Sequence, residues 1–301
     1  MDWERFGKSQ SFDRPPRERS LGPDSFLGGV RLKVALSMTA WKRPQYFEKV
    51  LDSIINAGGA ALPMHISIDG GYGEQQNVMR EIVEHKSLNA SVYAHEENLG
   101  CSANTHYALS KAFEDSSIDA IIHLEDDTML HPNFFDFMLP ALEHYKDQDM
   151  VFSISGYANR NLHPITEVWG SNNVGIRNRF TCWGWGITRN TWDEVSEDWF
   201  GINFTDYEKF VEDAAKGKNS FMSCISKDPK GSWAWPMNKH WRKDRLEIAP
   251  DESLVQNIGE EDGKFATSWS WQSQQTDLYF PNRIYESFDF EMADMELEEL
   301  S

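Results

Sequence analysis

The sequence is poor in cysteine and contains no long apolar run. Its three cysteines, Cys101, Cys182 and Cys224, are widely spaced and odd in number, and none forms a C-x-x-C pair. This pattern favours neither a disulfide framework nor a zinc site, and a reducing cytosol is the simpler assumption. No segment approaches the roughly 18 apolar residues of a membrane span, and the amino terminus lacks the apolar core of a signal peptide. We therefore expect a cytoplasmic protein without an integral membrane segment.

Basic residues are also scarce. The 29 lysines and arginines stand against 48 acids, which gives a net charge of -19. Nucleic acids and anionic membranes need a basic surface on their partner, so this charge disfavours both, although it allows a local basic pocket for a phosphate-bearing ligand. Part of the acidic excess lies near the C-terminus, where we expect residues 286–301 to form a solvated acidic tail.

The remaining composition is ordinary for a globular protein, with 40% hydrophobic and 26% charged residues in a chain of 301. Residues 1–29 are rich in Arg, Pro, Ser and Gly without a clean period, which predicts a flexible arm. From residue 30 to 285 we expect a single α/β domain with a doubly wound, mostly parallel sheet and helices on both faces. Its first half ends near residue 130, and the second half, 131–285, is built onto the same sheet.

The predicted elements of the first half alternate regularly. Strands are expected at residues 31–39, 65–68, 91–95 and 118–124, with helices starting at Pro44 and spanning 77–85 and 103–113. The second half is predicted to contain a helix at 133–145, a strand at 150–155 and a helix from residue 190. Polar residues follow each strand of the first half, and right-handed crossovers bring such strand ends to one edge of the sheet, where α/β folds bind ligands.

The fourth strand ends in three consecutive acids, Glu125, Asp126 and Asp127. Adjacent anions repel one another and lose hydration at a strand end, so a cation, a sugar hydroxyl or backbone donors must compensate. Carboxylate oxygens suit Mg²⁺ or Mn²⁺, ions that keep open positions for substrate phosphates. A solvated acidic turn is the alternative, and the apolar run before the triplet argues against it.

Aromatic residues alternate with glycines in the stretch from Phe180 to Thr188. Tryptophans in such a stretch either form flat platforms for sugar rings or pack in the core, and both interpretations remain open for Trp185. Further along, a basic cluster either clamps a diphosphate or a charged acceptor, or forms a solvated helix face. Its members are His240, Arg242, Lys243 and Arg245.

Together these motifs resemble a glycosyltransferase of the A-type fold, most closely the N-acetylglucosaminyltransferase I group and its bacterial sugar-transferase relatives. The likeness extends roughly from Leu32 to Ser268. It rests on the order of six motifs: Thr39 with Arg43, Ile-Asp69-Gly, Glu-Asn98-Leu-Gly100, Leu-Glu125-Asp126-Asp127, Cys-Trp-Gly-Trp185-Gly and Leu-Val-Gln-Asn257-Ile-Gly259.

The resemblance implies roles for these residues. Asp127 is the ligand of Mn²⁺ (or Mg²⁺), with Glu125 and Asp126 near the ribose and donor sugar. The metal neutralises the diphosphate as the glycosidic oxygen leaves. The remaining donor-site residues implied are Asp69 at the nucleobase or ribose, Arg43 near the diphosphate, and Thr39, Asn98, Gly100 and Trp185 around the donor.

Several of these residues also have a purely local interpretation. Asp69 stabilises a turn, Arg43 is a solvated side chain at a helix start, and residues 98–100 form a simple turn. From the residues alone, both interpretations stay open.

The sequence departs from the family pattern at the catalytic base. Inverting members deprotonate the acceptor hydroxyl with a carboxylate, which in this group lies in a Trp-Asp-Asp-Trp segment. Here residues 231–236 read Gly-Ser-Trp-Ala-Trp-Pro, without an acid. The candidate substitutes are Asp228 and, after the Gly-Trp-Gly motif, Asp193 and Glu194. A histidine that relatives carry after Asn-Ile-Gly is missing too, because residues 265–269 read Phe-Ala-Thr-Ser-Trp.

The leading hypothesis is therefore a metal-dependent, inverting glycosyltransferase that moves a sugar, N-acetylglucosamine from UDP-GlcNAc by preference, to a hydroxyl of a glycan or glycoconjugate. A nucleotidyltransferase is an alternative, but no G-x-G-x-x-G or Walker loop follows the first strand. A nucleotide-sugar-binding protein that has lost the base is the other alternative.

Overall fold

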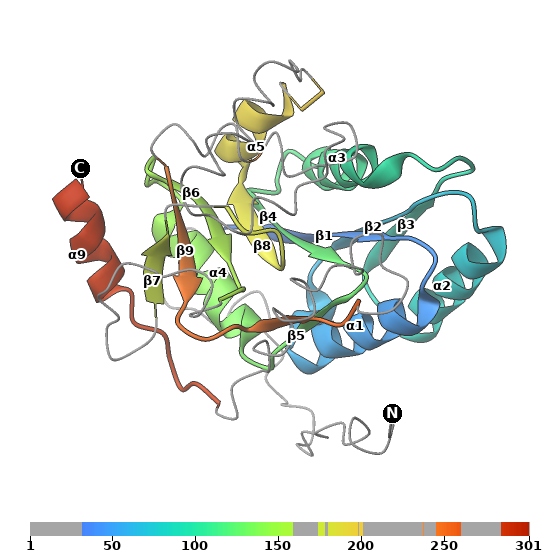
Figure 1. Ribbon diagram of the computed structural model, residues 1–301, viewed down its shortest axis with the longest axis horizontal. Helices are drawn as coiled ribbons and strands as arrows, with labels where there is room; N and C mark the ends of the chain where they lie inside the picture. The colour runs from blue at the N-terminus through green and yellow to red at the C-terminus, as the bar shows by residue number, and fades with distance from the viewer. Residues whose placement is uncertain are drawn as a thin grey trace, which may run out of the picture.

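The computed structural model describes residues 32–158, 174–177, 180–197, 199–200, 237, 245–259 and 284–300. Within them, an eight-stranded sheet has the strand order β3-β2-β1-β4-β8-β6-β9-β7. Helices cover both faces of this sheet, with α1, α2 and α4 on one side and α3 and α5 on the other (Figure 1). The predicted fold class, a mostly parallel α/β sheet between helices, is confirmed.

The first half of the chain forms the parallel part of the sheet, in which β1 lies between β2 and β4 and β2 pairs with β3. Its strands are β1 (Val34–Ala40), β2 (Met64–Ile68), β3 (Ala90–Ala94) and β4 (Ala120–Glu125). Its helices are α1 (Pro44–Asn56), the short 3₁₀ helix η2 (Gly59–Ala61), α2 (Gly73–His85) and α3 (Gly100–Phe113).

The register of these strands aligns their polar ends. Thr39 lies opposite Ser67 on one side and Glu125 on the other. Pro44 starts α1, where the missing N–H of proline is harmless, and the helix buries Phe47 and Ile54 against the sheet. In the structure α2 starts at Gly73, four residues before the predicted start at residue 77. The prediction missed this first turn because its residues are polar and show no apolar periodicity.

The second half extends the same sheet. Strand β8 runs antiparallel to both β4 and β6, β9 runs parallel to β6, and β7 closes the edge antiparallel to β9. The strands are β6 (Val151–Ser155), β7 (Val174–Arg177), β8 (Trp185–Thr188) and β9 (Leu246–Pro250), with helices α4 (Phe134–Tyr145) and α5 (Arg189–Ser196). A separate antiparallel pair joins β5 (Thr128–Leu130) to β10 (Val255–Asn257).

The structure of the acidic C-terminal segment differs from the prediction. We expected a solvated tail at residues 286–301, but this segment contains helix α9 (Glu291–Leu300). Ala293 and Leu297 of α9 are buried in the larger apolar cluster, which also includes residues of α1 and α4. Ahead of it, Phe288 packs edge-on against Phe137 of α4 with ring centroids 5.1 Å apart. The spacing of four between Ala293 and Leu297 places both on one helix face, a signal that the surrounding acids conceal.

Two further points concern the chain as a whole. No helix in the described part is long and apolar enough to cross a membrane. The arm predicted at residues 1–29 lies outside the described residues.

Candidate functional site

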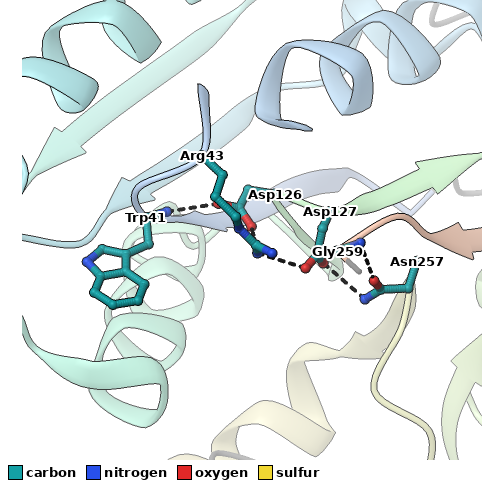
Figure 2. A network of polar contacts seen from close by, with 6 residues as sticks. All are labelled: Trp41, Arg43, Asp126, Asp127, Asn257 and Gly259. Atoms are coloured by element: carbon teal, nitrogen blue, oxygen red, sulfur yellow. Dashed lines mark hydrogen bonds and ion pairs between the residues drawn. The ribbon is translucent and has the colours of Figure 1, made fainter. Parts of the chain in front are cut away.

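The acidic triplet lies at the carboxyl end of β4, beside the end of β1. Glu125 ends β4 and is partly exposed, whereas Asp126 and Asp127 lie in the turn to β5 and are almost wholly buried. Figure 2 shows the guanidinium group of Arg43 placed between the carboxylates of Asp126 and Asp127. The structure thus brings together three of the predicted site residues from two strand ends.

All four carboxylate oxygens of this acid pair accept a hydrogen bond. Arg43 Nη2 donates to Asp126 Oδ1 at 2.6 Å and to Asp127 Oδ2 at 2.7 Å. The backbone N–H of Trp41 donates to Asp126 Oδ2 at 3.0 Å, and Asn257 Nδ2 donates to Asp127 Oδ1 at 3.1 Å. The pair is therefore compensated by one cation and two neutral donors, which is what buried carboxylates require.

The charges of this network shift the acidity of its members. Burial raises the pKa of Asp126 above its ordinary value, and the neighbouring Asp127 acts in the same direction while Arg43 opposes both. Burial alone would lower the pKa of Arg43, but the two acids outweigh it and raise that pKa. Two negative charges face one positive charge, so the network keeps a net negative charge that a further cation can offset.

Arg43 is held by the start of α1. Its carbonyl accepts the backbone N–H groups of Tyr46 and Phe47, each at 3.1 Å, and Pro44 fixes the next backbone angle. The guanidinium lies 5.4 Å from the centroid of the Tyr46 ring. Its Nη1 atom is buried and makes no hydrogen bond within the described residues.

A segment far along the chain covers the acid pair. Asn257 ends β10, and the following Ile258 donates its N–H to the carbonyl of Asp127 at 2.7 Å. Gly259 donates its N–H to Asn257 Oδ1 at 2.8 Å, which orients the amide toward Asp127. A Cβ atom on Gly259 would stand 2.1 Å from Asp127 Oδ2, so any larger residue there would have to displace the Asp127 carboxylate. The sequence identified this segment by resemblance but gave no contact for it.

Asp69 joins the end of β2 to the start of α3. Its Oδ1 accepts the N–H groups of Gly70 and Leu99 at 2.9 and 2.6 Å, and its Oδ2 accepts that of Gly100 at 3.1 Å. Asn98 Nδ2 lies 3.4 Å from the carbonyl of Gly70. These contacts give Asp69, Asn98 and Gly100 a structural role at this sheet edge, and their contact with a donor stays a prediction.

Trp41 is a site residue that the sequence motifs did not identify. Besides its backbone contact with Asp126, its indole Nε1 donates to the carbonyl of Gly70 at 3.1 Å. The ring meets that of Tyr72 edge-on at a centroid distance of 5.3 Å, and Tyr72 is exposed. An aromatic residue directly after the first strand, in line with the other strand-end residues, was the available signal.

Two of the predicted residues lie elsewhere. Trp185 is fully buried, and its ring centroid lies 5.2 Å from those of both His123 and Phe180, so the structure places it in the core and not on a platform. Asp193 is exposed on α5, which starts where Thr188 pairs with Ala120 at the amino end of β4. Because β8 runs antiparallel to β4, α5 begins at the sheet edge opposite the triplet, and Asp193 is not brought to the site.

Of the remaining candidate residues, the structure describes only some. Asp228 lies outside the described residues, as do His240, Arg242 and Lys243 of the basic cluster. Arg245 is described and forms an ion pair with Glu194 of α5. Both residues therefore have a structural partner away from the triplet. Thr39 is partly buried at the end of β1.

The residues present fit a divalent cation that arrives with a phosphate ligand. The described part of the chain contains no group of three or more His, Cys, Asp or Glu side chains able to hold a metal by themselves. Mg²⁺ commonly binds through one or two carboxylates, with substrate phosphates and water filling the other positions. Asp127, with Asp126 beside it, offers such carboxylates.

A model of the GNT-I family matches residues 27–228, more than half of the chain. The chain belongs to the GNT-I family. This confirms the resemblance to the N-acetylglucosaminyltransferase I group. A curated relative is the alpha-1,3-mannosyl-glycoprotein 2-beta-N-acetylglucosaminyltransferase of Arabidopsis thaliana, 23% identical over 210 residues. The match covers 62% of this chain but only 44% of that relative.

Solved structures similar to this member of the GNT-I family include S. aureus TarS 1–349. The complex of TarS with UDP has a TM-score of 0.32 and 16% identity, over 41% of this chain and 35% of TarS. The complex of TarS with UDP-GlcNAc has a TM-score of 0.31 and 15% identity, over 41% and 34%.

Proposed function

We propose that the protein is a metal-dependent glycosyltransferase that transfers a sugar from a nucleotide diphosphate donor to a hydroxyl of a glycan or glycoconjugate. UDP-GlcNAc is the favoured donor, because the plant relative is named as an N-acetylglucosaminyltransferase. The observation that carries the proposal is the Asp126–Asp127 pair at the carboxyl edge of the parallel strands, held by Arg43 and closed by Asn257. The low cysteine content supports a cytoplasmic location, which we propose with it.

Each part of this network has a task in such a reaction. Asp127 would hold Mn²⁺ or Mg²⁺, and the bound ion supplies Lewis-acid stabilisation of the departing diphosphate. Trp41 orients Asp126 through its backbone N–H, and Asn257 orients Asp127 through its amide. Trp41 and the exposed Tyr72 offer aromatic surface at the same edge. We retain Asp228 as the proposed general base of an inverting transfer.

The proposal is tested by calorimetric titration of UDP, and separately GDP, with and without Mn²⁺. We expect UDP binding that requires Mn²⁺ and is lost in Asp127→Asn. Asp149→Asn, the same chemical change at an exposed turn position, is the matched control. If neither nucleotide binds, or if Asp127→Asn binds UDP as the parent does, the donor site is wrongly assigned.

A nucleotide-sugar-binding protein is the second candidate, since residues 231–236 lack the acid found in relatives. The two functions differ in slow donor hydrolysis, which an enzyme shows and a binding protein does not. Release of UDP from UDP-GlcNAc in the presence of Mn²⁺, absent in Asp127→Asn, would support the enzyme. Metal-dependent UDP binding without any release would favour the binding protein.

A further inference from the structure

Every carboxylate oxygen of the acid pair in the proposed donor site already accepts a hydrogen bond from the protein. Arg43 Nη2 alone bridges Asp126 Oδ1 and Asp127 Oδ2, and the other two oxygens accept from Trp41 and Asn257. The bridge is sheltered, since the Arg43 side chain is 13% exposed and the two acids 6% and 12%. In this arrangement Arg43 is the counter-cation of the pair.

A metal ion that ligates Asp127 must compete with this guanidinium. Mg²⁺ lies about 2.0–2.1 Å from a carboxylate oxygen, while the guanidinium nitrogen lies 2.7 Å from Asp127 Oδ2. Two cations so close in a buried site repel strongly, because water screens them poorly. The metal and Arg43 therefore compete for Asp127 Oδ2.

Arg43 has a second anion to move to when the donor is present. Its backbone is fixed by the start of α1, so only the side chain needs to rearrange. Its Nη1 is buried without a hydrogen-bond partner in the described part of the chain, which leaves donor capacity unused. A guanidinium group matches phosphate oxygens with two parallel hydrogen bonds, so a diphosphate is a suitable partner.

We propose that Arg43 neutralises Asp126 and Asp127 while the donor site is empty, and passes from Asp127 to the donor diphosphate when metal and nucleotide bind. This inference rests on the proposed function and adds a coupling between its two ligands. The metal alone binds weakly because Arg43 occupies its ligand, and the diphosphate releases that ligand by attracting Arg43. Coupled sites of this kind typically change each other's affinity about 5- to 150-fold.

The test is Mn²⁺ binding without nucleotide, followed through the paramagnetic resonance signal of free Mn²⁺. In Arg43→Gln the competitor is gone, so we expect Mn²⁺ alone to bind about tenfold or more tightly than to the parent. The same variant should bind UDP more weakly at saturating Mn²⁺, because the diphosphate loses its guanidinium. Lys49→Gln, an equal charge change on the exposed side of α1, should leave both affinities unchanged.

The outcomes separate this inference from the proposed function. If the parent binds UDP with Mn²⁺ but Arg43→Gln binds Mn²⁺ no more tightly than the parent, the exchange is wrong and the donor site stands. If the parent binds no UDP at any Mn²⁺ concentration, the proposed function itself fails. Should Arg43→Gln not fold, Arg43→Met replaces it, because its unbranched side chain fills the same space and carries no charge that competes with the metal. Its Mn²⁺ affinity without nucleotide must then exceed that of the parent, and an unchanged affinity overturns the exchange.

Discussion

At the scale of single residues, Gly259 sets the shape of the candidate donor site. A Cβ atom there would lie 2.1 Å from Asp127 Oδ2 and 2.9 Å from Arg43 Nη1. Gly259→Ala should therefore push Asp127 away from Arg43 and weaken Mn²⁺-dependent UDP binding about tenfold or more, since displacements near 1 Å can reduce activity about 100-fold. Calorimetric titration checks this, with circular dichroism to verify the fold.

The matched control for this prediction is Gly73→Ala. Gly73 begins α2, and a Cβ atom there meets nothing within 4 Å. The control should bind UDP as the parent does. Equal UDP affinities for Gly259→Ala and Gly73→Ala would show that Gly259 does not constrain the acid pair.

His123 makes stability depend on pH. Burial lowers the pKa of this histidine to about 3, while its ring packs on Trp185 and its Nδ1 lies 3.1 Å from Ser37 Oγ. Below about pH 6.5 this histidine is protonated in the unfolded chain but stays neutral in the folded chain. The contribution of His123 to the unfolding free energy is therefore complete above that pH and decreases as the pH drops toward 3. The slope from this group approaches roughly 1.4 kcal/mol per pH unit.

Urea unfolding between pH 4 and 7 measures this dependence. His123→Gln should show a shallower loss of unfolding free energy on acidification than the parent. His85→Gln, at an exposed position of α2, should keep the slope of the parent. Identical slopes for all three proteins would mean that His123 does not hold its neutral form in the folded state.

The residues that the sequence could identify are those whose signal is local. An apolar run followed by three acids marks a strand end wherever the chain goes afterwards, so the position of Asp126 and Asp127 was predictable. Asn257 contacts Asp127 across 130 residues, and no local pattern encodes that pairing. Trp185 stayed ambiguous because β8 has buried positions on both faces, and alternation then carries no information about exposure.

At the scale of elements, α9 shows how charge can conceal a buried helix face. Leu297 is 6% exposed in the larger apolar cluster, whereas Met295, two residues earlier, is 51% exposed. Leu297→Ala should lower the unfolding free energy by roughly 2–4 kcal/mol, because it removes buried methyl groups and leaves a cavity. Met295→Ala on the same helix should change it by less than about 0.5 kcal/mol.

Urea denaturation of the two variants beside the parent decides this prediction. A loss in Leu297→Ala no greater than that in Met295→Ala would mean that α9 does not dock on the core in solution. Helix boundaries are hidden from the sequence in a similar way, because apolar periodicity locates the buried middle of α2 but not its polar first turn.

At the scale of the whole molecule, the two predicted halves share one sheet and two apolar clusters. Strand β8 of the second half pairs with β4 of the first, and one apolar cluster runs from Val34 in β1 to Leu297 in α9. The sequence indicated this fold class because predicted strands and helices alternate and polar residues follow each strand of the first half. It did not indicate the antiparallel insertion of β8, which depends on contacts between distant segments.

This shared sheet predicts a single cooperative unfolding unit, which Gly186→Val can probe. A Cβ atom on Gly186 would lie 3.1 Å from the carbonyl oxygen of Ile121 in β4 and 3.3 Å from Leu142 of α4. A branched side chain there strains the junction between the halves, at a cost of about 1–3 kcal/mol. Native-state hydrogen exchange should show that β1 in the first half and β9 in the second lose the same protection free energy, because neither half unfolds without the other. If β9 alone lost protection while β1 kept the value of the parent, the halves would be separate folding units, and the acid pair would be stable without the strands that follow it.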